Sequence, residues 1–418
     1  DGIRDVLLSL VGSEMCIRDR VGTVRRCLAS SMVGMCALLT GCASRPPVPE
    51  VDQEPLRVVP PVEWPVLGDD LPTEGLIEAM EYSIEYFENV AQDTVFRFGP
   101  EERTALEMAS GVRRMRDLVR AESDPARLTA RVQREFILLE SVGRDGRGTV
   151  LFTGYYEPVV NARRRAEPPY EYPVYGIPED LVSVDPKIFG FASFPRSLVG
   201  RVEGRELRPY ASRAEIDFGD GLPAPAPVLG YLADPVDVFF LQVQGSGTLV
   251  FPDGSKLRAG YAVSNGWEYR SIGKLLLDEG LVSREEMSMQ AIRSYLAAHP
   301  EDLERVLSYN PSYVFFRPLD DAGGPLGCYG LPVTAGRSIA TDRRLFPGPA
   351  VAWVTGTMPS IHGGEETFAR FVLNQDTGGS IKGPDRVDLF VGTGGEAAEI
   401  AGRMQHLGRF YLLLPISS

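Results

Sequence analysis

Three short segments of the chain combine glycines with acidic, hydroxyl or aromatic side chains more densely than ordinary turns and loops require. They are residues 153–158 (TGYYEP), 242–247 (QVQGSG) and 376–383 (DTGGSIKG). The third leads to Asp388, which stands between Val387 and Leu389 in an expected strand. Apolar neighbours shield a carboxyl from water and favour its protonated form, so Asp388 is a candidate general acid. The plainer interpretation is an aspartate that caps a turn at the end of a strand.

Three other acids lie in or beside these segments. Asp376 lies upstream of Asp388, and we expect it to accept hydrogen bonds from the backbone amides of the Gly378-Gly379 turn. Glu157 follows two tyrosines and is a competing carboxyl. Asp385 lies in a Gly-Pro-Asp turn that water should reach.

Composition predicts a globular protein and excludes several classes. The 418 residues are 44% hydrophobic and 24% charged, which is ordinary usage, and this length predicts two or three domains. The 57 acidic residues outnumber the 43 basic ones, and a net charge of −14 argues against binding to nucleic acid. The histidines His299, His362 and His406 are far apart. We therefore expect neither a metal site nor a cofactor.

The amino terminus is typical of an export signal. Residues 21–41 carry two arginines ahead of a short apolar stretch, and the LTGC sequence that ends at Cys42 resembles the lipobox of a bacterial lipoprotein signal peptide. The alternative is a chance apolar run. The lipobox predicts lipidation of Cys42 and a location at the periplasmic face of the outer membrane. Residues 1–20 place acids ahead of the basic region, which no export signal requires, and are interpreted as a non-native leader.

The rest of the chain predicts a tether, then helices, then strands. Residues 42–65 are rich in proline and predict an extended tether. Apolar spacing predicts a helix over 73–90, a second over 106–118 and a third that starts with Asp124 as its cap and runs to Leu139. From Thr149, short apolar runs separated by turn residues are typical of β-barrels. Residues 241–244 alternate apolar and polar residues and predict a half-buried strand.

Together the three segments resemble the lytic murein transglycosylase A family, a group of outer-membrane lipoproteins. The third segment, continued to Asp388, also resembles the carboxy-terminal module named for its three aspartates. The resemblance runs from about Thr73 to Pro415, and it includes further blocks at residues 265–266, 269–274, 287–292 and 310–316.

The family resemblance implies a mainly β fold with helices at its start. A double-psi β-barrel domain, residues 66–157 and 317–418, would be interrupted by a smaller β-barrel domain, residues 158–316. The glycan would lie in the groove between the two domains. The family cleaves the β-1,4 bond between N-acetylmuramic acid and N-acetylglucosamine without water and leaves a 1,6-anhydro ring.

The resemblance also implies the chemistry of one carboxyl, at Asp388. Because the attacking C6 hydroxyl belongs to the substrate, no second carboxyl is needed to supply a nucleophile. Asp388 would first protonate the glycosidic oxygen and then take the proton of the C6 hydroxyl. The expected substrate-binding residues are Thr153, Tyr155, Tyr156, Gln244, Gly245, Ser246, Gly247, Asp376, Gly378, Gly379 and Lys382. For Asp376 a structural role is the stronger expectation, and Lys382 could equally be an exposed lysine.

Two other functions remain open at this point. One is a non-catalytic glycan-binding lipoprotein on the same barrel, and the other is a hydrolase that admits water and uses Glu157 as a second carboxylate. Expected partners are peptidoglycan glycan strands and the outer membrane. The protein is otherwise expected to be a monomer, unless it joins a complex for cell-wall synthesis or remodelling.

Overall fold

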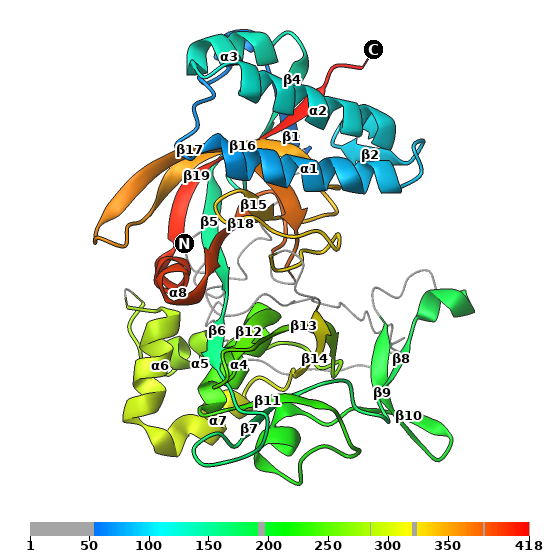
Figure 1. Ribbon diagram of the computed structural model, residues 1–418, viewed down its shortest axis with the longest axis vertical. Coiled ribbons are helices and arrows are strands. Elements are labelled where there is room, and N and C mark those ends of the chain that lie inside the picture. The colour runs from blue at the N-terminus through cyan, green and yellow to red at the C-terminus, as the bar shows by residue number, and fades with distance from the viewer. Residues whose placement is uncertain (1–53, 191–196, 285, 320–323, 379–380, 418) are drawn as a thin grey trace, which may run out of the picture.

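The computed structural model describes residues 54–190, 197–284, 286–319, 324–378 and 381–417. The expected leader, the signal peptide, Cys42 and the first part of the expected tether lie outside these residues. The described chain forms two bodies, and Figure 1 shows a barrel covered by α1, α2 and α3 above a second body built from β6 to β14. Among the described helices, none is long and apolar enough to cross a membrane.

The strands are β1 (Leu56–Val59), β2 (Val95–Phe98), β3 (Glu101–Thr104), β4 (Phe136–Ser141), β5 (Val150–Glu157), β6 (Val159–Asn161), β7 (Tyr172–Tyr175), β8 (Val182–Val184), β9 (Leu198–Glu203), β10 (Glu206–Pro209), β11 (Val228–Leu232), β12 (Ser246–Val250), β13 (Lys256–Ser264), β14 (Val314–Leu319), β15 (Ser338–Ala340), β16 (Val351–Pro359), β17 (Glu365–Asp376), β18 (Arg386–Thr393) and β19 (Gln405–Pro415). The α-helices are α1 (Thr73–Asn89), α2 (Ala105–Ala121), α3 (Pro125–Val132), α4 (Pro235–Gln244), α5 (Ile272–Asp278), α6 (Met289–Ala298), α7 (Leu303–Ser308) and α8 (Gly394–Arg403).

Six strands of the upper body close into a barrel. Their order is β19-β16-β17-β15-β18-β5, and the ring closes because β5 pairs with β19 as well as with β18. The pairs β15–β17 and β18–β5 are parallel, whereas the other neighbours are antiparallel. Closure leaves these strands without an open edge. The expected fold class, mainly β with helices at the start and a closed barrel, is confirmed.

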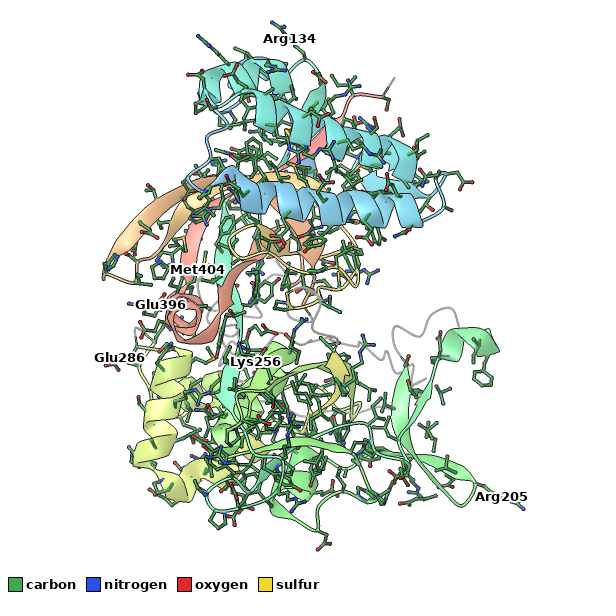
Figure 2. All side chains as sticks on the ribbon, viewed as in Figure 1. Arg134, Arg205, Lys256, Glu286, Glu396 and Met404 are labelled. Atoms are coloured by element: carbon green, nitrogen blue, oxygen red, sulfur yellow. The ribbon has the colours of Figure 1, made fainter. Side chains whose placement is uncertain are left out.

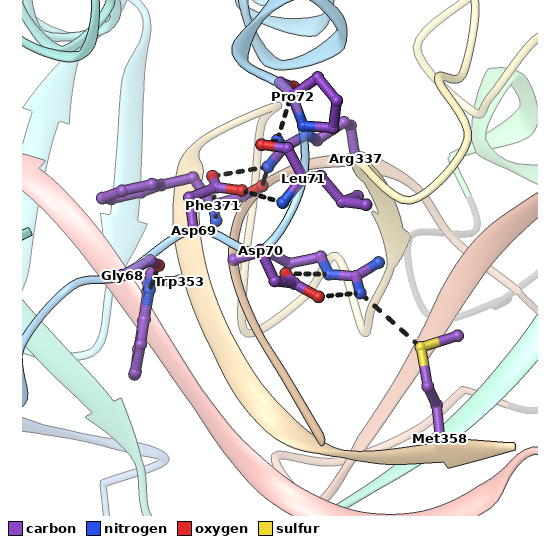
Figure 3. Close-up of polar contacts among 10 residues, drawn as sticks. Gly68, Asp69, Asp70, Leu71, Pro72, Arg337, Trp353, Met358 and Phe371 are labelled. Atoms are coloured by element: carbon purple, nitrogen blue, oxygen red, sulfur yellow. Dashed lines mark hydrogen bonds and ion pairs between the residues drawn. The ribbon is translucent and has the colours of Figure 1, made fainter. Parts of the chain in front are cut away.

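The segment before α1 is fixed to the barrel by two buried arginines, of which Arg337 is labelled in Figure 3 with its partners Asp69, Leu71 and Pro72. Arg337 pairs with Asp69 at 2.7 Å and also donates to the carbonyls of Leu71 and Pro72. Arg370 of β17 makes a two-pronged contact with Asp70. Because buried charges are costly without partners, these contacts hold the start of α1 in one position against β17.

The lower body closes in a similar way, partly through single bridges. Strands β6, β12, β13 and β14 form one sheet and β7 pairs with β11. The bridges Gly176–Phe316 and Arg163–Tyr231 join these two sheets at their outer strands. The body is therefore a second ring of strands, which the chain enters after β5 and leaves after β14.

The two bodies share a hydrophobic cluster around α8. Ala397 and Ala401 of α8 pack in one cluster with Phe239, Ile292 and other apolar residues of the lower body. Gln290 of α6 donates to the carbonyl of Ala398 at 3.0 Å. In Figure 2, Glu396 marks α8 directly above the segment marked by Glu286. This contact fixes the walls of the space between the bodies.

Three expectations about local structure are wrong. Strand β1 pairs with β4 and buries Leu56 and Val59, so the expected tether does not extend to Pro65. The third helix ends at Val132, and residues 136–139 lie in β4, because the unbroken apolar run FILL suits a strand buried on both faces. Residues 241–244 belong to α4, since the cap Asp234, a following proline and the left-handed Gly245 specify a helix.

Candidate active site

A cavity of about 550 Å³ lies between the two bodies. The barrel contributes Tyr155, Ala340, Asp376, Asp388 and Phe390 to its lining. The lower body and the end of β14 contribute the opposite wall, which includes Gln244, Gly245, Ser246, Gly260, Tyr261 and Arg317. The loop after β14 adds Leu326 and Cys328 beside the end of β17. The cavity therefore collects residues from all three of the segments that stand out in the sequence.

Asp388 of β18 is held through one of its two carboxyl oxygens. Asp388 is 6% exposed. Thr153 pairs with Asp388 across β5 and β18, and the Thr153 hydroxyl donates a short hydrogen bond to Oδ1 of Asp388. Arg386 Nε donates to the same oxygen at 3.1 Å. Among the described residues, no donor bonds Oδ2. The carboxyl is thus fixed in position while Oδ2 remains available to a bound ligand.

A β-bulge aligns Asp376 with Ala340 and Asp388 across three neighbouring strands. In the pairing of β15 with β17, Ile339 faces Asn374 and Ala340 faces Asp376, so Gln375 is left out of the register. The Gln375 side chain is buried, accepts a hydrogen bond from Ser338 and donates to the carbonyl of Ala79 in α1. Helix α1 therefore helps to turn Asp376 toward the cavity.

Asp376 is the carboxyl whose protonation the surroundings alter most clearly. Burial raises the pKa of Asp376 to about 6, and the charge of Asp388 adds to this effect. Its Oδ1 accepts hydrogen bonds from the amides of Thr377 at 2.8 Å and Cys328 at 3.0 Å, which oppose the rise in pKa. Within the described residues the Gly378 amide does not donate to Asp376, contrary to expectation, and Gly379 lies outside them. Asp376 instead ties the end of β17 to the loop that contains Cys328.

Tyr155 presents an unusual buried hydroxyl. Its ring centroid lies 5.2 Å from that of Phe390, and its hydroxyl is buried beside the Asp376 carboxyl, which is its polar neighbour in the cavity wall. Burial and the nearby Asp376 carboxyl raise the pKa of Tyr155 well above its usual value, so the hydroxyl stays protonated. The protonated hydroxyl therefore lines the cavity as a hydrogen-bond donor next to Asp376.

The wall opposite the barrel begins at the end of α4. Gly245 has φ 75°, a left-handed conformation that ends the helix and that glycine adopts without strain. The Gln244 side chain accepts a hydrogen bond from the Tyr156 amide at 3.4 Å. This contact joins the wall to β5, and Tyr156 itself is 6% exposed.

Comparisons with known proteins point to one family. The model described as the MltA specific insert domain matches residues 151–317, and the 3D domain model matches residues 337–414. The membrane-bound lytic murein transglycosylase A of Escherichia coli (strain K12) is 37% identical over 277 residues, which cover 65% of this chain and 67% of that protein. The chain belongs to the lytic murein transglycosylase A family. The expected enzyme class is thereby confirmed.

Solved structures of the lytic murein transglycosylase A family share this fold. The membrane-bound lytic murein transglycosylase from Agrobacterium tumefaciens has a TM-score of 0.70 at 31% identity, over 86% of this chain and 97% of its own. The E. coli MltA structure with bound chitohexaose has a TM-score of 0.67 at 28% identity, over 87% of this chain and 95% of its own.

Most of the residues expected from the family resemblance line the cavity. They are Tyr155, Tyr156, Gln244, Gly245, Ser246, Asp376, Gly378 and Asp388. Thr153 lies behind Asp388 and is 4% exposed, and Gly247 packs against Leu241 and the Pro158 carbonyl. Lys382 is exposed and is not among the residues that line the cavity. Gly379 lies outside the described residues.

Glu157, the competing carboxyl, lies apart from the cavity that contains Asp388. It is 5% exposed, is not among the lining residues, and faces Arg258 with 4.0 Å between Oε1 and Nε. Burial raises the pKa of Glu157, and the charge of Arg258 partly offsets the rise. In the described ranges, no cluster of three or more histidine, cysteine, aspartate or glutamate residues could hold a metal ion.

Several lining residues were not predicted from the sequence. Ala340 separates the two aspartates, and Arg317 is an exposed cation on the wall opposite the barrel. Cys328 is partly buried in the cavity wall. Burial raises the pKa of its thiol to about 12. The position of Arg317 directly after the family block at 310–316 is a signal that could have found it, but nothing in the sequence marks Ala340.

Proposed function

We propose that the chain cleaves the β-1,4 bond between N-acetylmuramic acid and N-acetylglucosamine in peptidoglycan and leaves 1,6-anhydro-muramic acid ends. The observation that carries this proposal is the geometry of Asp388, a buried carboxyl fixed through Oδ1 with Oδ2 open toward the cavity. Family membership supports the reaction class, and the relative with bound chitohexaose supports a β-1,4-linked sugar chain as ligand.

In the first step the protonated Asp388 donates its proton to the glycosidic oxygen. The bond from C1 of muramic acid to that oxygen breaks, and the N-acetylglucosamine side leaves as an alcohol. Asp388 becomes a carboxylate. The hydroxyl of Thr153 and the guanidinium of Arg386 both donate to Oδ1, so they stabilise the charge that forms.

In the second step the Asp388 carboxylate takes the proton of the C6 hydroxyl of the same muramic acid. The C6 oxygen then bonds to C1 and closes the anhydro ring, and Asp388 returns to its protonated form. Because the nucleophile is part of the substrate, its position is set by the sugar ring and no water takes part. One carboxyl therefore acts twice.

Other lining residues are suited to hold the glycan. The Tyr155 hydroxyl can donate to a sugar oxygen, and the backbone at Gly245 and Ser246 can approach a sugar closely. Arg317 supplies a cation for the lactyl carboxylate of a muramic acid that carries no peptide. Asp376 shapes the wall through its bonds to Thr377 and Cys328 rather than by touching the scissile bond.

The hydrolase alternative has less support. Glu157 is outside the lining, and its carboxyl faces Arg258 instead of a sugar. Asp376 does line the cavity, but it lies on the same barrel wall as Asp388, whereas a base that activates water must act from the opposite face of the sugar ring.

The location of the chain is also a proposal. The relatives are described as membrane-bound, and the LTGC sequence resembles a lipobox. Both support a lipid anchor on Cys42 that holds the enzyme at the periplasmic face of the outer membrane, where it meets glycan strands and joins a wall-remodelling complex.

Isotope labelling tests the reaction. Purified peptidoglycan is digested in water enriched in oxygen-18, and the new muramic acid ends are analysed by mass spectrometry. Intramolecular attack predicts ends without the label. Ends that carry one oxygen-18 would show that water is the nucleophile and would contradict the proposal.

A further inference from the structure

The lower body contains a second cavity, with a volume of about 440 Å³. It lies at the base of the β9–β10 hairpin, whose tip is marked by Arg205 in Figure 2. Its lining includes Arg201, Glu215, Asp220 and Trp267, and none of its lining residues belongs to the cavity that contains Asp388. It is therefore a separate site on the inserted body.

Trp267 offers an exposed ring in a fixed orientation. The residue is 40% exposed, although its indole N–H donates to the carbonyl of Tyr210 at 2.7 Å. Because that hydrogen bond already satisfies the polar edge of the indole, the exposed part of the ring is apolar. A flat, rigid aromatic face is a suitable surface for the C–H face of a pyranose ring.

The turn that carries Trp267 is fixed by hydrogen bonds of the buried Asn265 side chain. Asn265 is 1% exposed, and its side-chain amide donates to the carbonyls of Ala211 and Pro311 at 2.9 Å each. Its oxygen accepts a hydrogen bond from the Tyr313 amide at 2.9 Å. Gly266 has φ +86°, and a Cβ there would lie 3.0 Å from Val199, so the turn requires glycine. The ring is thus held in place before any ligand arrives.

Polar groups of both signs surround the ring. Glu215 accepts hydrogen bonds from the amide and hydroxyl of Ser212 through Oε2, which lower its pKa, and nearby Arg201 lowers it further. Within the described part of the chain, its Oε1 takes no hydrogen bond. Asp220 is exposed at the same cavity. Carboxylates and a guanidinium beside an aromatic ring can bond the hydroxyl and amide groups of a neutral sugar.

We propose that this cavity is a second glycan-binding site, which holds a β-1,4-linked N-acetylglucosamine-containing strand away from the Asp388 cavity. Trp267 stacks on one sugar ring, and Glu215, Asp220 and Arg201 bond its polar groups. This inference rests on the proposed function, because the ligand of the second cavity is the same kind of glycan strand that the Asp388 cavity would cleave. A second hold on a polymeric substrate would keep the strand near the enzyme between cleavage events.

Tryptophan fluorescence can test this site selectively. The sequence has three tryptophans, and Trp353 is 3% exposed while Trp64 packs against the barrel core. No tryptophan lines the Asp388 cavity. Chitohexaose is titrated into the full folded chain carrying Asp388→Ala, which prevents turnover, and emission is followed to millimolar concentrations. We expect a saturable change in emission, and its absence in the Asp388→Ala/Trp267→Phe variant.

Calorimetry provides the independent measurement. The Asp388→Ala protein should bind two chitohexaose molecules, and addition of Trp267→Ala should leave one. Adding Asp220→Ala instead removes an exposed carboxylate that makes no hydrogen bond or ion pair with the described residues, and it should weaken the second site about fivefold. Circular dichroism confirms that each variant is folded. A single binding site in the Asp388→Ala protein, or emission that chitohexaose leaves unchanged, would overturn the proposal.

Failure of the second glycan-binding site can be distinguished from failure of the proposed reaction. Failure of the proposed transglycosylase function would appear as labelled or absent products in oxygen-18 water. Failure of the second site would appear only in the emission and the binding stoichiometry.

Discussion

Asp376 and Asp388 lie on either side of Ala340 in adjacent strands of the barrel. Ala340 of β15 pairs with Asp376 of β17 in one direction and with Asp388 of β18 in the other. Two strand spacings place their Cα atoms about 10 Å apart on one wall. This arrangement gives the two carboxyls different partners: Asp388 bonds Thr153 and Arg386, whereas Asp376 bonds the amides of a loop.

The contact from Thr153 to Asp388 predicts a loss of turnover without a loss of binding. Thr153→Val keeps the shape and strand propensity of the side chain but removes its hydrogen bond to Oδ1. Loss of one hydrogen bond to a charged group costs about 1.5–3 kcal/mol, so kcat should fall about 10- to 100-fold with little change in KM. Initial rates of muropeptide release measure this. Thr153→Ser keeps the hydroxyl and should stay near wild type; an unchanged kcat in Thr153→Val would contradict the role of the contact.

The raised pKa of Asp376 predicts a pH-dependent stability. Its pKa of about 6 in the folded chain exceeds the ordinary 3.8, so ionisation is less favourable in the folded state and stability falls as pH rises from about 4 to about 6. Asp376→Asn removes this effect and keeps an oxygen for the two amides. The free energy of unfolding of Asp376→Asn minus that of wild type should be about 2 kcal/mol larger at pH 7.5 than at pH 4.5. Urea denaturation at both pH values measures this difference.

The matched control for this experiment is Asp278→Asn. Asp278 is an exposed aspartate at the end of α5, far from any contact with the cavity lining. Its substitution should shift stability equally at both pH values. A gap between Asp376→Asn and wild type that does not change with pH would refute the role of Asp376 ionisation.

Glu157 provides a prediction that separates the two catalytic schemes. Glu157→Gln keeps the size of the side chain and removes a carboxyl that lies outside the cavity lining. We expect kcat/KM for peptidoglycan within about threefold of wild type, because no proton transfer uses this residue. The same release assay measures it. A loss of 100-fold or more would return Glu157 to the mechanism.

The functional segments were accessible to sequence reasoning because they are local. Asp388 on β18 and the 153–157 stretch on β5 lie on neighbouring strands, and Asp388 and Tyr155 both line the cavity as the family resemblance implied. The wrong strand at 241–244 shows how a four-residue alternation misleads. The signals of Asp234 and Gly245 at the two ends of α4 were present in the sequence and carry more weight.

Long-range pairing was not accessible in the same way. Ala340 matters only because β15 lies between β17 and β18, and no local pattern around it reveals that register. The bulge at Gln375 depends on contacts with Ser338 and with Ala79 of α1, which are distant in the chain. The exposed, fixed orientation of the Trp267 ring likewise depends on hydrogen bonds to Tyr210 and Asn265, and Tyr210 is distant in the chain.

The most direct test of the central claim compares the products of two proteins. Purified peptidoglycan is digested with the soluble chain from Ala43 onward and, in parallel, with its Asp388→Ala variant, and the muropeptides are weighed by mass spectrometry. The account predicts products lighter by one water than hydrolysis products from the first protein and none from the second. Products of hydrolytic mass, or anhydro products from the Asp388→Ala protein, would contradict it.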